Sequence, residues 1–346
     1  MRTPTEEHTT VDIEERIRRN PGEFRVLTGD RPTGRLHVGH YFGTLHNRVR
    51  LQRQGVEMMI LIADYQVITD RDRPEDLSEF ADEFVADYLA CGIDPERATI
   101  FAHSAVPELN QLLLPFLSLI SVAELQRNPT VKDEIAAAGR STVSGLMFTY
   151  PAHQAADILF GKANLVPVGK DQLPHLELTR TIARRFNERY APIFPEPEAL
   201  LSPAPLLLGT DGQKMSKSRG NAITLGASAD QTAALLRRAK TDADRMVTYD
   251  PVARPEVSNL VLLAALSQDR DPAEVAAQIG DRGAAELKRV VTESLNECLA
   301  PIRGRRAELL ADRAYLRKIL RRGNEQARSL AVDTLREVRD VMGMTY

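Results

Sequence analysis

Apolar and polar positions along the chain follow two alternating patterns, one typical of buried strands and one typical of amphipathic helices. Short apolar runs at residues 24–27, 58–63 and 98–102 are bounded by turn or polar residues, as buried strands are. Between them, apolar side chains recur at helical spacing: Val38, Phe42, Leu45 and Val49 before Gly55, and Leu77, Phe80, Phe84 and Leu89 before Gly92. Strands that alternate with helices, without hairpin signals, predict a parallel sheet covered on both faces.

The rest of the chain departs from this alternation. Residues 107–160 are mainly helical in pattern and interrupt the sheet, before a strand at 164–168 and a helix at 174–190 restore the alternation. After about residue 226 the strand signals nearly vanish, and heptad-like apolar spacing with many arginines predicts a helical C-terminal domain. Residues 1–22 are expected to form a frayed or weakly helical N-terminal extension that ends at Pro21-Gly22.

Amino-acid composition excludes only a few classes of protein. The 346 residues, 43% of them hydrophobic, suit one large or two modest domains with substantial cores. A formal charge of −3 neither supports nor excludes a nucleic-acid partner. Two cysteines, Cys91 and Cys298, cannot form a disulfide framework or a four-ligand zinc site, so we expect reduced core cysteines. A polar, partly acidic N-terminus and the lack of any apolar run of about 20 residues favour the cytoplasm.

A first chemical motif spans residues 32–40, at the end of the first predicted strand. A strand that delivers the chain to a helix N-terminus there offers free N–H groups and the positive end of the helix dipole to a phosphate. Gly39 lets a base or ribose approach the backbone, and His37 and His40, three residues apart, can both donate to phosphate oxygens. The alternative is two surface histidines near a helix start, because the pattern His-x-Gly-His is short.

A second motif, Lys214-Met215-Ser216-Lys217-Ser218, lies between Asp211-Gly212-Gln213 and Arg219-Gly220-Asn221. A polar loop with two lysines, two small hydroxyl residues and flanking glycines is suited to bind phosphate. The alternative is a solvated charged loop without a ligand.

Together the two motifs resemble the HIGH and KMSKS signatures of class I aminoacyl-tRNA synthetases, in the expected order. The resemblance implies a Rossmann-like parallel sheet with a helical insertion at about 105–160 in a catalytic domain at 23–225, followed by an all-helical anticodon-binding domain at 226–346. It also implies a ligase reaction in which an amino acid carboxylate attacks the α-phosphate of ATP, with Mg²⁺ as the usual cofactor. The attacking group is already anionic, so catalysis would rest on positioning and charge stabilisation by His37, His40, Lys214 and Lys217.

Longer segments resemble the tryptophanyl-tRNA synthetases: residues 28–34, 150–159, 166–172, 175–180 and 182–187. By that resemblance, Asp157 would accept the indole N–H, a charge-assisted hydrogen bond that rejects analogues without the N–H. The tryptophan site implied by the resemblance comprises Asp157, Tyr150, Gln154, Gln66, Leu27, Val166, Val168 and Gln172. The ATP site comprises Arg31, Pro32, Thr33, Gly39, His40, Gly169, Lys170, Asp171, Leu206, Lys214, Met215, Ser216, Lys217 and Ser218. For Tyr150, Val166 and Val168, simple core packing is the alternative.

Four residues depart from the commoner tryptophanyl pattern. Arg31 stands where Gln is usual, His40 where Asn is common, Gln66 where His is frequent and Gln154 where Met is frequent. A Gln at position 154 is more similar to the pattern of the tyrosyl enzyme, so tyrosine remains an alternative substrate. These departures suggest, as a hypothesis, a divergent second copy with reduced sensitivity to tryptophan-mimicking inhibitors.

The resemblance also implies partners, namely L-tryptophan, tRNA(Trp) and a second copy of the chain. Basic residues at Arg303, Arg305, Arg306, Arg317, Lys318, Arg321 and Arg322 would supply the salt-dependent affinity for tRNA, unless they form an ordinary solvated helix surface. The apolar segment at 112–125 is either interior packing or a two-fold interface, and the homodimeric family favours the interface. Two other functions remain open: a paralogue that does not charge tRNA, and a nucleotidyltransferase unrelated to tRNA.

Overall fold

The structure is a computed structural model that describes residues 6–69, 77–129, 131–132, 143–201, 207–215 and 219–346. Within these residues, five parallel strands form one sheet in the order β3-β2-β1-β4-β5. The strands are β1 (Arg25–Asp30), β2 (Glu57–Ile62), β3 (Ala98–Ala102), β4 (Leu165–Val168) and β5 (Glu198–Leu201). The predicted class, a parallel α/β sheet with a helical C-terminal part, is confirmed.

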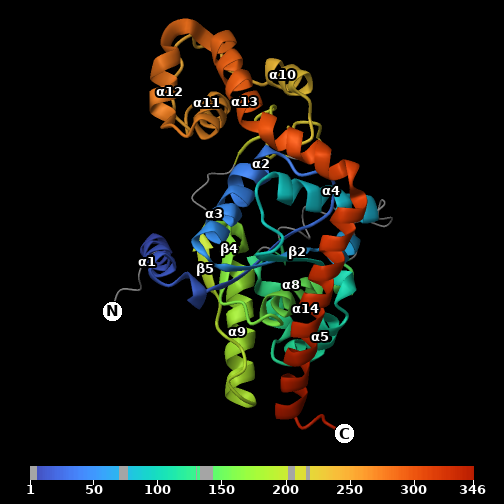
Figure 1. Cartoon of the computed structure of the whole chain (residues 1–346). Helices are drawn as coiled ribbons and strands as arrows, with labels where there is room; N and C mark the ends of the chain where they lie inside the picture. The colour runs from blue at the N-terminus through green and yellow to red at the C-terminus, as the bar shows by residue number, and fades with distance from the viewer. Residues whose placement is uncertain (1–5, 70–76, 130, 133–142, 202–206, 216–218) are drawn as a thin grey trace.

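Helices connect the strands and form the whole of the C-terminal part (Figure 1). Those before and between the strands are α1 (Glu6–Arg19), η1 (Pro21–Glu23), α2 (Val38–His40), η2 (Tyr41–Leu45), α3 (His46–Gln54), η3 (Tyr65–Thr69), α4 (Leu77–Ala90), η4 (His103–Ala105), α5 (Glu108–Leu117), α6 (Val122–Arg127), α8 (Gly145–Leu159), η5 (Lys170–Gln172) and α9 (Leu173–Arg189). Those after the sheet are α10 (Ala229–Arg237), α11 (Pro255–Gln268), α12 (Pro272–Ile279), η6 (Gly280–Arg282), α13 (Gly283–Ala311) and α14 (Arg313–Val341).

Successive residues of a strand point to opposite faces of the sheet, so each strand contributes to two hydrophobic cores. Met58 and Ile60 of β2 belong to a core that also contains side chains of α1, α3 and α4. Met59 and Leu61 belong to the second core, with side chains of α5, α8, α9 and α14. Because both faces are covered, a strand such as β2 is apolar along most of its length, which is why short apolar runs predicted the strands.

The N-terminal helix is better packed than the expected frayed extension. Ile13 and Ile17, four residues apart on α1, are completely buried in the first core. Arg16 donates to both carboxylate oxygens of Glu198 in β5, at 2.9 and 3.0 Å. Two buried aliphatic side chains among many charged ones gave too weak a periodic signal for the sequence to predict this packing.

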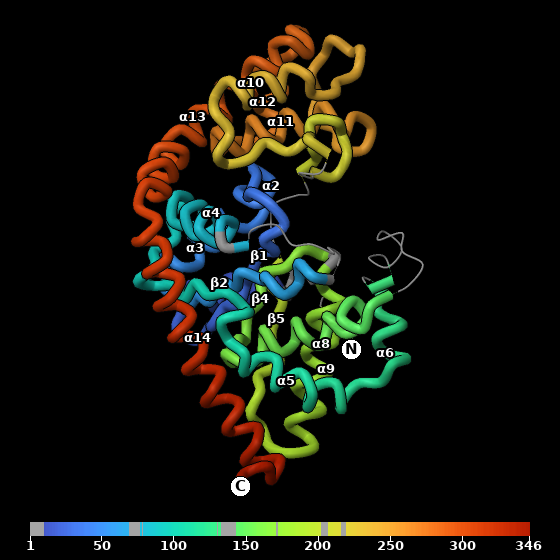
Figure 2. Tube along the Cα trace, turned by 90° about the vertical axis from the view of Figure 1, so that its right-hand side faces the viewer, coloured from blue at the N-terminus to red at the C-terminus, as the bar shows by residue number. Residues whose placement is uncertain are grey.

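The C-terminal helices divide between a lobe and the edge of the sheet. In Figures 1 and 2, α10, α11 and α12 gather at one end of the molecule, and α13 leads down from them to α14. Helix α14 packs so closely on β3 that a Cβ built on Gly323 would lie 1.8 Å from the carbonyl oxygen of Ile100. The side chain of Asn324 accepts a hydrogen bond from the backbone N–H of Ala102 at 2.9 Å. The last helix of the expected C-terminal domain therefore covers the edge strand of the catalytic domain.

Candidate active site

The carboxyl ends of the parallel strands bring together most of the candidate residues. Strand β1 ends at Asp30 and leads to the first motif, and β2 ends at Ile62, close before Gln66. His103 follows β3 directly, and Gly169 follows β4. In a parallel sheet these ends lie along one edge, where α/β proteins bind ligands.

The two histidines of the first motif form one unit. His37 is the N-cap of α2 and is buried, and its ring centroid lies 3.8 Å from that of His40. Nδ1 of His40 accepts a hydrogen bond from the backbone N–H of His37 at 3.2 Å. Because Nδ1 accepts, the neutral ring carries its proton on Nε2, which is then the atom able to donate to a phosphate.

Gly39 has a packing role that the sequence did not suggest. A Cβ built on Gly39 would lie 3.0 Å from the ring of His37 and 3.4 Å from Sδ of Met215. The missing side chain therefore makes room for His37 and for the buried methionine of the second motif. The two motifs meet at this glycine.

Backbone hydrogen bonds also join the segments that carry the motifs. The N–H of Val38 donates to the carbonyl of Ile223 at 2.9 Å, and the N–H of Leu225 donates to the carbonyl of Leu36 at 2.9 Å. The segment that follows the second motif is thus paired with the segment that enters the first helix. This pairing fixes the position of both motifs relative to each other.

Lys214 stands exposed at the start of the second motif, and its backbone is held in place. It forms an isolated bridge with Leu208, and its carbonyl accepts from the side chain of Asn221 at 3.2 Å. Leu206, Ser216, Lys217 and Ser218 lie outside the described residues, so their predicted roles stay predictions.

The other predicted ATP residues lie in two loops at the same edge of the sheet. Arg31 is exposed, Pro32 is buried, and the N–H of Thr33 donates to the carbonyl of Arg31 at 2.7 Å. Gly169 and Lys170 are exposed at the start of η5, whose backbone includes Asp171.

The residues predicted to bind tryptophan separate into a group in the hydrophobic core and a polar group. Leu27, Val166 and Val168 are buried in the second core, and Gln154 and Gln172 are half-buried. Tyr150 is buried, and its hydroxyl lies 2.8 Å from Nε2 of His175. The sequence analysis did not identify His175 as a partner of Tyr150, since 25 residues separate them.

Asp157 is the centre of a buried polar cluster. Its side chain is 2% exposed; Nδ1 of His103 lies 2.9 Å from Oδ1, and the amide of Gln66 donates to Oδ2 at 3.0 Å. His153 lies one turn before Asp157 on α8, and its Nε2 is 2.9 Å from Oδ1 of Asn110. Asp157 and Gln66 were candidate site residues from the sequence, whereas His103 and His153 were not.

The histidines of this cluster differ in their pKa values. Burial lowers the pKa of His103, but the Asp157 carboxylate outweighs that effect and raises the pKa above its ordinary value of 6.5. Burial lowers the pKa of His153, because it disfavours the charged form. The centroids of the two rings are 4.3 Å apart, so two neighbouring histidines have pKa values shifted in opposite directions.

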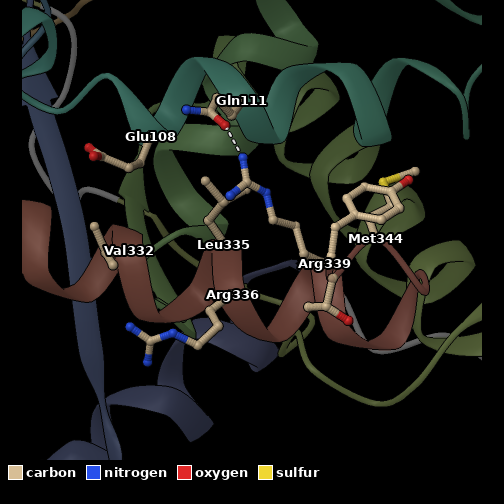
Figure 3. Close-up of a pocket in the computed structure, with 9 residues that line it drawn as sticks. Glu108, Gln111, Val332, Leu335, Arg336, Arg339 and Met344 are labelled. Carbon is tan, nitrogen blue, oxygen red and sulfur yellow. Dashed lines mark hydrogen bonds between the residues drawn. The ribbon is translucent and has the colours of Figure 1, made fainter.

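A hollow of about 760 Å³ lies elsewhere, between α5 and α14 (Figure 3). It is lined by Glu108, Gln111, Val332, Leu335, Arg336, Arg339 and residues 344–346. Arg339 reaches across it and donates to the side chain of Gln111 (Figure 3). None of the described residues of the two motifs lines this hollow, which is therefore separate from the candidate site at the strand ends.

The C-terminal basic residues do not form the continuous free surface that the sequence suggested. Four of them bind within the chain: Arg303 to Thr232, Arg306 to Asp87, Arg317 to Asp82 and Arg322 to Glu96. Asp82 and Asp87 are buried on α4, so Arg306 and Arg317 join α13 and α14 to the catalytic domain. Arg305, Lys318 and Arg321 are exposed and make no ion pair within the described residues. The basic surface is smaller than expected.

In the part of the chain that the structure describes, no helix is both long and apolar enough to cross a membrane.

Comparisons with known proteins agree with this geometry. The model of the family described as tRNA synthetases class I (W and Y) matches residues 19–300. A tryptophan–tRNA ligase of Treponema pallidum is 44% identical over 331 residues, which cover 93% of this chain and 97% of that protein. A crystal structure of tryptophanyl-tRNA synthetase from Campylobacter jejuni, complexed with ADP and tryptophan, has a TM-score of 0.79 and 32% identity and covers 92% of this chain and 99% of that chain. A tyrosyl-tRNA synthetase from Archaeoglobus fulgidus, with a TM-score of 0.68 and 24% identity, covers 86% of this chain and 95% of that chain and shows only the shared fold.

Proposed function

Because this chain belongs to the class I tRNA synthetases of the tryptophan and tyrosine type, we propose that it activates L-tryptophan with ATP and transfers it to tRNA(Trp). The observation that carries the proposal is the buried Asp157, an acceptor for the indole N–H, at the edge of the sheet where the two phosphate-binding motifs meet. The tryptophan–tRNA ligases that are 40–44% identical to nearly the whole chain support this substrate.

The first step is an in-line displacement at the α-phosphate of ATP. A carboxylate oxygen of tryptophan forms a bond to the α-phosphorus, the bond to the bridging oxygen breaks, and pyrophosphate leaves with that electron pair. No base is required, because the nucleophile is an anion. The chain contributes charge stabilisation: Nε2–H of His40 donates to a phosphate oxygen, and Lys214 and Lys217 place their cations on the leaving pyrophosphate.

Mg²⁺ would fit this site as an ion bound to the phosphates of ATP. Among the described residues, no group of three His, Cys, Asp or Glu side chains is arranged to hold a metal ion. The ion would therefore be held mainly by phosphate oxygens, which it prefers, and would add positive charge beside the transferred group.

Binding of the amino acid uses the carboxylate of Asp157 and the apolar side chains near it. Oδ2 of Asp157 accepts the indole N–H, and Leu27, Val166 and Val168 form the apolar walls. Gln172 holds the charged end of the substrate. Gly169, Lys170 and Asp171 contact the ribose of ATP, at the carboxyl end of β4.

In the second step a hydroxyl of the terminal adenosine of tRNA attacks the carbonyl carbon of the adenylate, and AMP leaves. The lobe of α10 to α13 contacts the anticodon, and Arg305, Lys318 and Arg321 bind the tRNA backbone through salt-dependent contacts. An enzyme with these substrates works where tRNA and ATP are present, so we expect it in the cytoplasm.

The active form is a homodimer. Leu114 of α5 and Val122 of α6 are 73% and 62% exposed, although they lie in an otherwise apolar insertion. Large exposed aliphatic side chains on one segment are typical of a surface that a partner covers. The two-fold axis of a dimer would bring this face against its own copy.

ATP–pyrophosphate exchange with each of the twenty amino acids tests the proposed substrate. Exchange that depends on tryptophan supports the proposal, whereas exchange that depends on tyrosine supports the tyrosyl alternative. Absence of exchange with every amino acid would support a paralogue that does not charge tRNA.

A further inference from the structure

His103 lies directly beside the carboxylate that recognises the indole in the proposed function. It is the first residue after β3 and is completely buried, and its Nδ1 is 2.9 Å from Oδ1 of Asp157. The amide of Gln66 donates to the other oxygen, Oδ2, at 3.0 Å. The aspartate is thus held from two sides by residues that follow two neighbouring strands.

We propose that His103 is a positioning residue for substrate recognition, which acts through Asp157 by holding Oδ1 and balancing its charge, so that Oδ2 is aimed at the indole N–H. The proposal rests on the function proposed above. It adds to that function a residue that never touches the substrate and yet determines how strongly the site selects an N–H donor.

The position of His103 is itself fixed by the fold. Asp64, which follows β2, accepts hydrogen bonds on Oδ1 from the N–H of Tyr65 at 3.0 Å and from the N–H of Ser104 at 2.9 Å. These contacts join the ends of β2 and β3 and leave the His103 ring between them and Asp157. The rings of Tyr65 and His103 pack in an edge-to-face arrangement, with 5.2 Å between the centroids.

A buried carboxylate without a partner is costly, and removal of one member of a buried ion pair leaves the other uncompensated. Four groups with polar or aromatic side chains face His103 from two elements: Asp157 and His153 from α8, and Asp64 and Tyr65 from the segment after β2. The uncharged amide of Asn110 on α5 is also close to it. The two carboxylates raise the pKa of His103 against the effect of burial, whereas burial lowers the pKa of His153. Of the two histidines, His103 is therefore the one that more readily carries a positive charge.

A tryptophan analogue whose indole nitrogen is replaced by sulfur, β-(3-benzothienyl)alanine, tests whether His103 acts through Asp157. ATP–pyrophosphate exchange gives kcat and KM for both substrates in the full-length protein. In His103→Leu, kcat/KM for tryptophan is expected to fall about 30-fold, mainly through KM, while kcat/KM for the analogue changes less than about threefold. Equal losses for the two substrates would mean a merely structural role and would overturn the proposal.

Two further variants separate charge from shape. His103→Asn keeps a neutral N–H donor near the position of Nδ1 and is expected to recover part of the preference for tryptophan. His153→Gln is the matched control, because His153 is equally buried and stacks on His103 but its nitrogen faces Asn110. It is expected to leave the ratio of kcat/KM for tryptophan to kcat/KM for the analogue unchanged. If this ratio falls as much as in His103→Leu, the assignment to His103 is contradicted.

The pH profile of the unmodified protein needs no variant and stands even if His103→Leu does not fold. Since the pKa of His103 is raised, its charge is present below that value and is lost as the pH rises through it. KM for tryptophan should therefore rise with pH above 6.5, and KM for the analogue, which has the same amino and carboxyl groups, should not follow. Parallel profiles would overturn the proposal. Complete lack of exchange with tryptophan would instead contradict the proposed function.

Discussion

The side-chain amide of Gln66 donates a hydrogen bond to Oδ2 of Asp157 at 3.0 Å, across 91 residues of sequence. This contact joins the loop after β2 to helix α8, and it occupies the oxygen that the proposed function assigns to the indole N–H. A carboxylate oxygen has two lone pairs, so it can accept from both donors. Gln66, one of the departures from the commoner pattern, is thus part of the acceptor itself.

Replacement of Gln66 by Leu should weaken tryptophan recognition. Loss of a hydrogen bond to a charged group corresponds to about 1.5 kcal/mol, or about a tenfold fall in kcat/KM for tryptophan in the exchange assay. Gln66→Glu, which is similar in size but places a second carboxylate beside Asp157, should cause a larger loss. If Gln66→Leu has the activity of the unmodified protein, Gln66 does not support the acceptor.

Lys214→Ala should lower the rate of adenylate formation with little effect on tryptophan binding. Its cation is proposed to act on the phosphates, where charge develops in the transition state, so kcat should fall about 100-fold. KM for tryptophan should stay within about threefold. Lys288→Ala, which removes a half-buried lysine of the helical lobe that donates to the carbonyl of Arg237, is the control and should retain full activity in the exchange assay. A change confined to KM for tryptophan would contradict the proposed role of Lys214.

The reduced basic surface on α13 and α14 leads to a prediction about tRNA. The double variant Lys318→Glu and Arg321→Glu should lower the rate of tRNA charging at least about tenfold, more strongly at low salt than at high salt, and should spare ATP–pyrophosphate exchange. Arg336→Glu provides the control, since Arg336 is exposed on the far half of the same helix and pairs with Asp333. Equal loss of charging and exchange in the double variant would show that these residues stabilise the fold and do not bind tRNA.

The sequence predicted those parts of the molecule that depend on neighbouring residues. β1, β2 and β3 were identified because each is a short apolar run with a polar boundary, whereas β5 was missed because Glu198–Leu201 is short and only Leu200 is buried. The two motifs are continuous in sequence and were found as such.

Contacts between distant segments could not be predicted in this way. His103 reaches Asp157 across 54 residues, and Arg306 reaches Asp87 across 219, so neither pair has a sequence signal. For this reason the positioning histidine was overlooked. For the same reason, it could not be predicted that Arg306 and Arg317, both candidates for tRNA binding, pair with buried acids of α4.

The pair of Arg48 and Asp30 allows a test of stability against pH. Nη1 of Arg48 lies 2.5 Å from Oδ2 of Asp30, and the hydroxyl of Tyr88 donates to the same oxygen at 2.8 Å. Burial raises the pKa of Asp30, but the guanidinium outweighs it and holds the pKa below the ordinary value of 3.8. The stabilisation is therefore fully present above pH 3.8 and is lost as the pH falls further.

Arg48→Leu should lower the free energy of unfolding by about 3–5 kcal/mol at neutral pH, measured by urea denaturation, because it leaves a buried carboxylate uncompensated. The difference from the unmodified protein should narrow in acid. Adding Asp30→Asn to Arg48→Leu should restore most of the loss. A double variant as unstable as the single one would show that the lost charge pair is not the cause.

Leu114→Asp should convert the proposed homodimer to a monomer, because it places a charge at the centre of an interface that excludes water. The mass in solution, measured by size-exclusion chromatography with light scattering, reports this directly. Val252→Asp changes an even more exposed aliphatic residue outside the insertion and should leave the mass unchanged. A monomeric unmodified protein would contradict the proposed dimer.

Formation of the adenylate in a single turnover tests the central claim most directly. The protein is mixed with ATP, Mg²⁺ and tryptophan or tyrosine without tRNA, the reaction is quenched, and the bound product is identified by mass spectrometry. We predict about one tryptophanyl-adenylate per active site, a strong reduction in Asp157→Ala, and no tyrosyl-adenylate at equal concentration. Tyrosyl-adenylate, or no adenylate at all from a folded protein, would contradict the account.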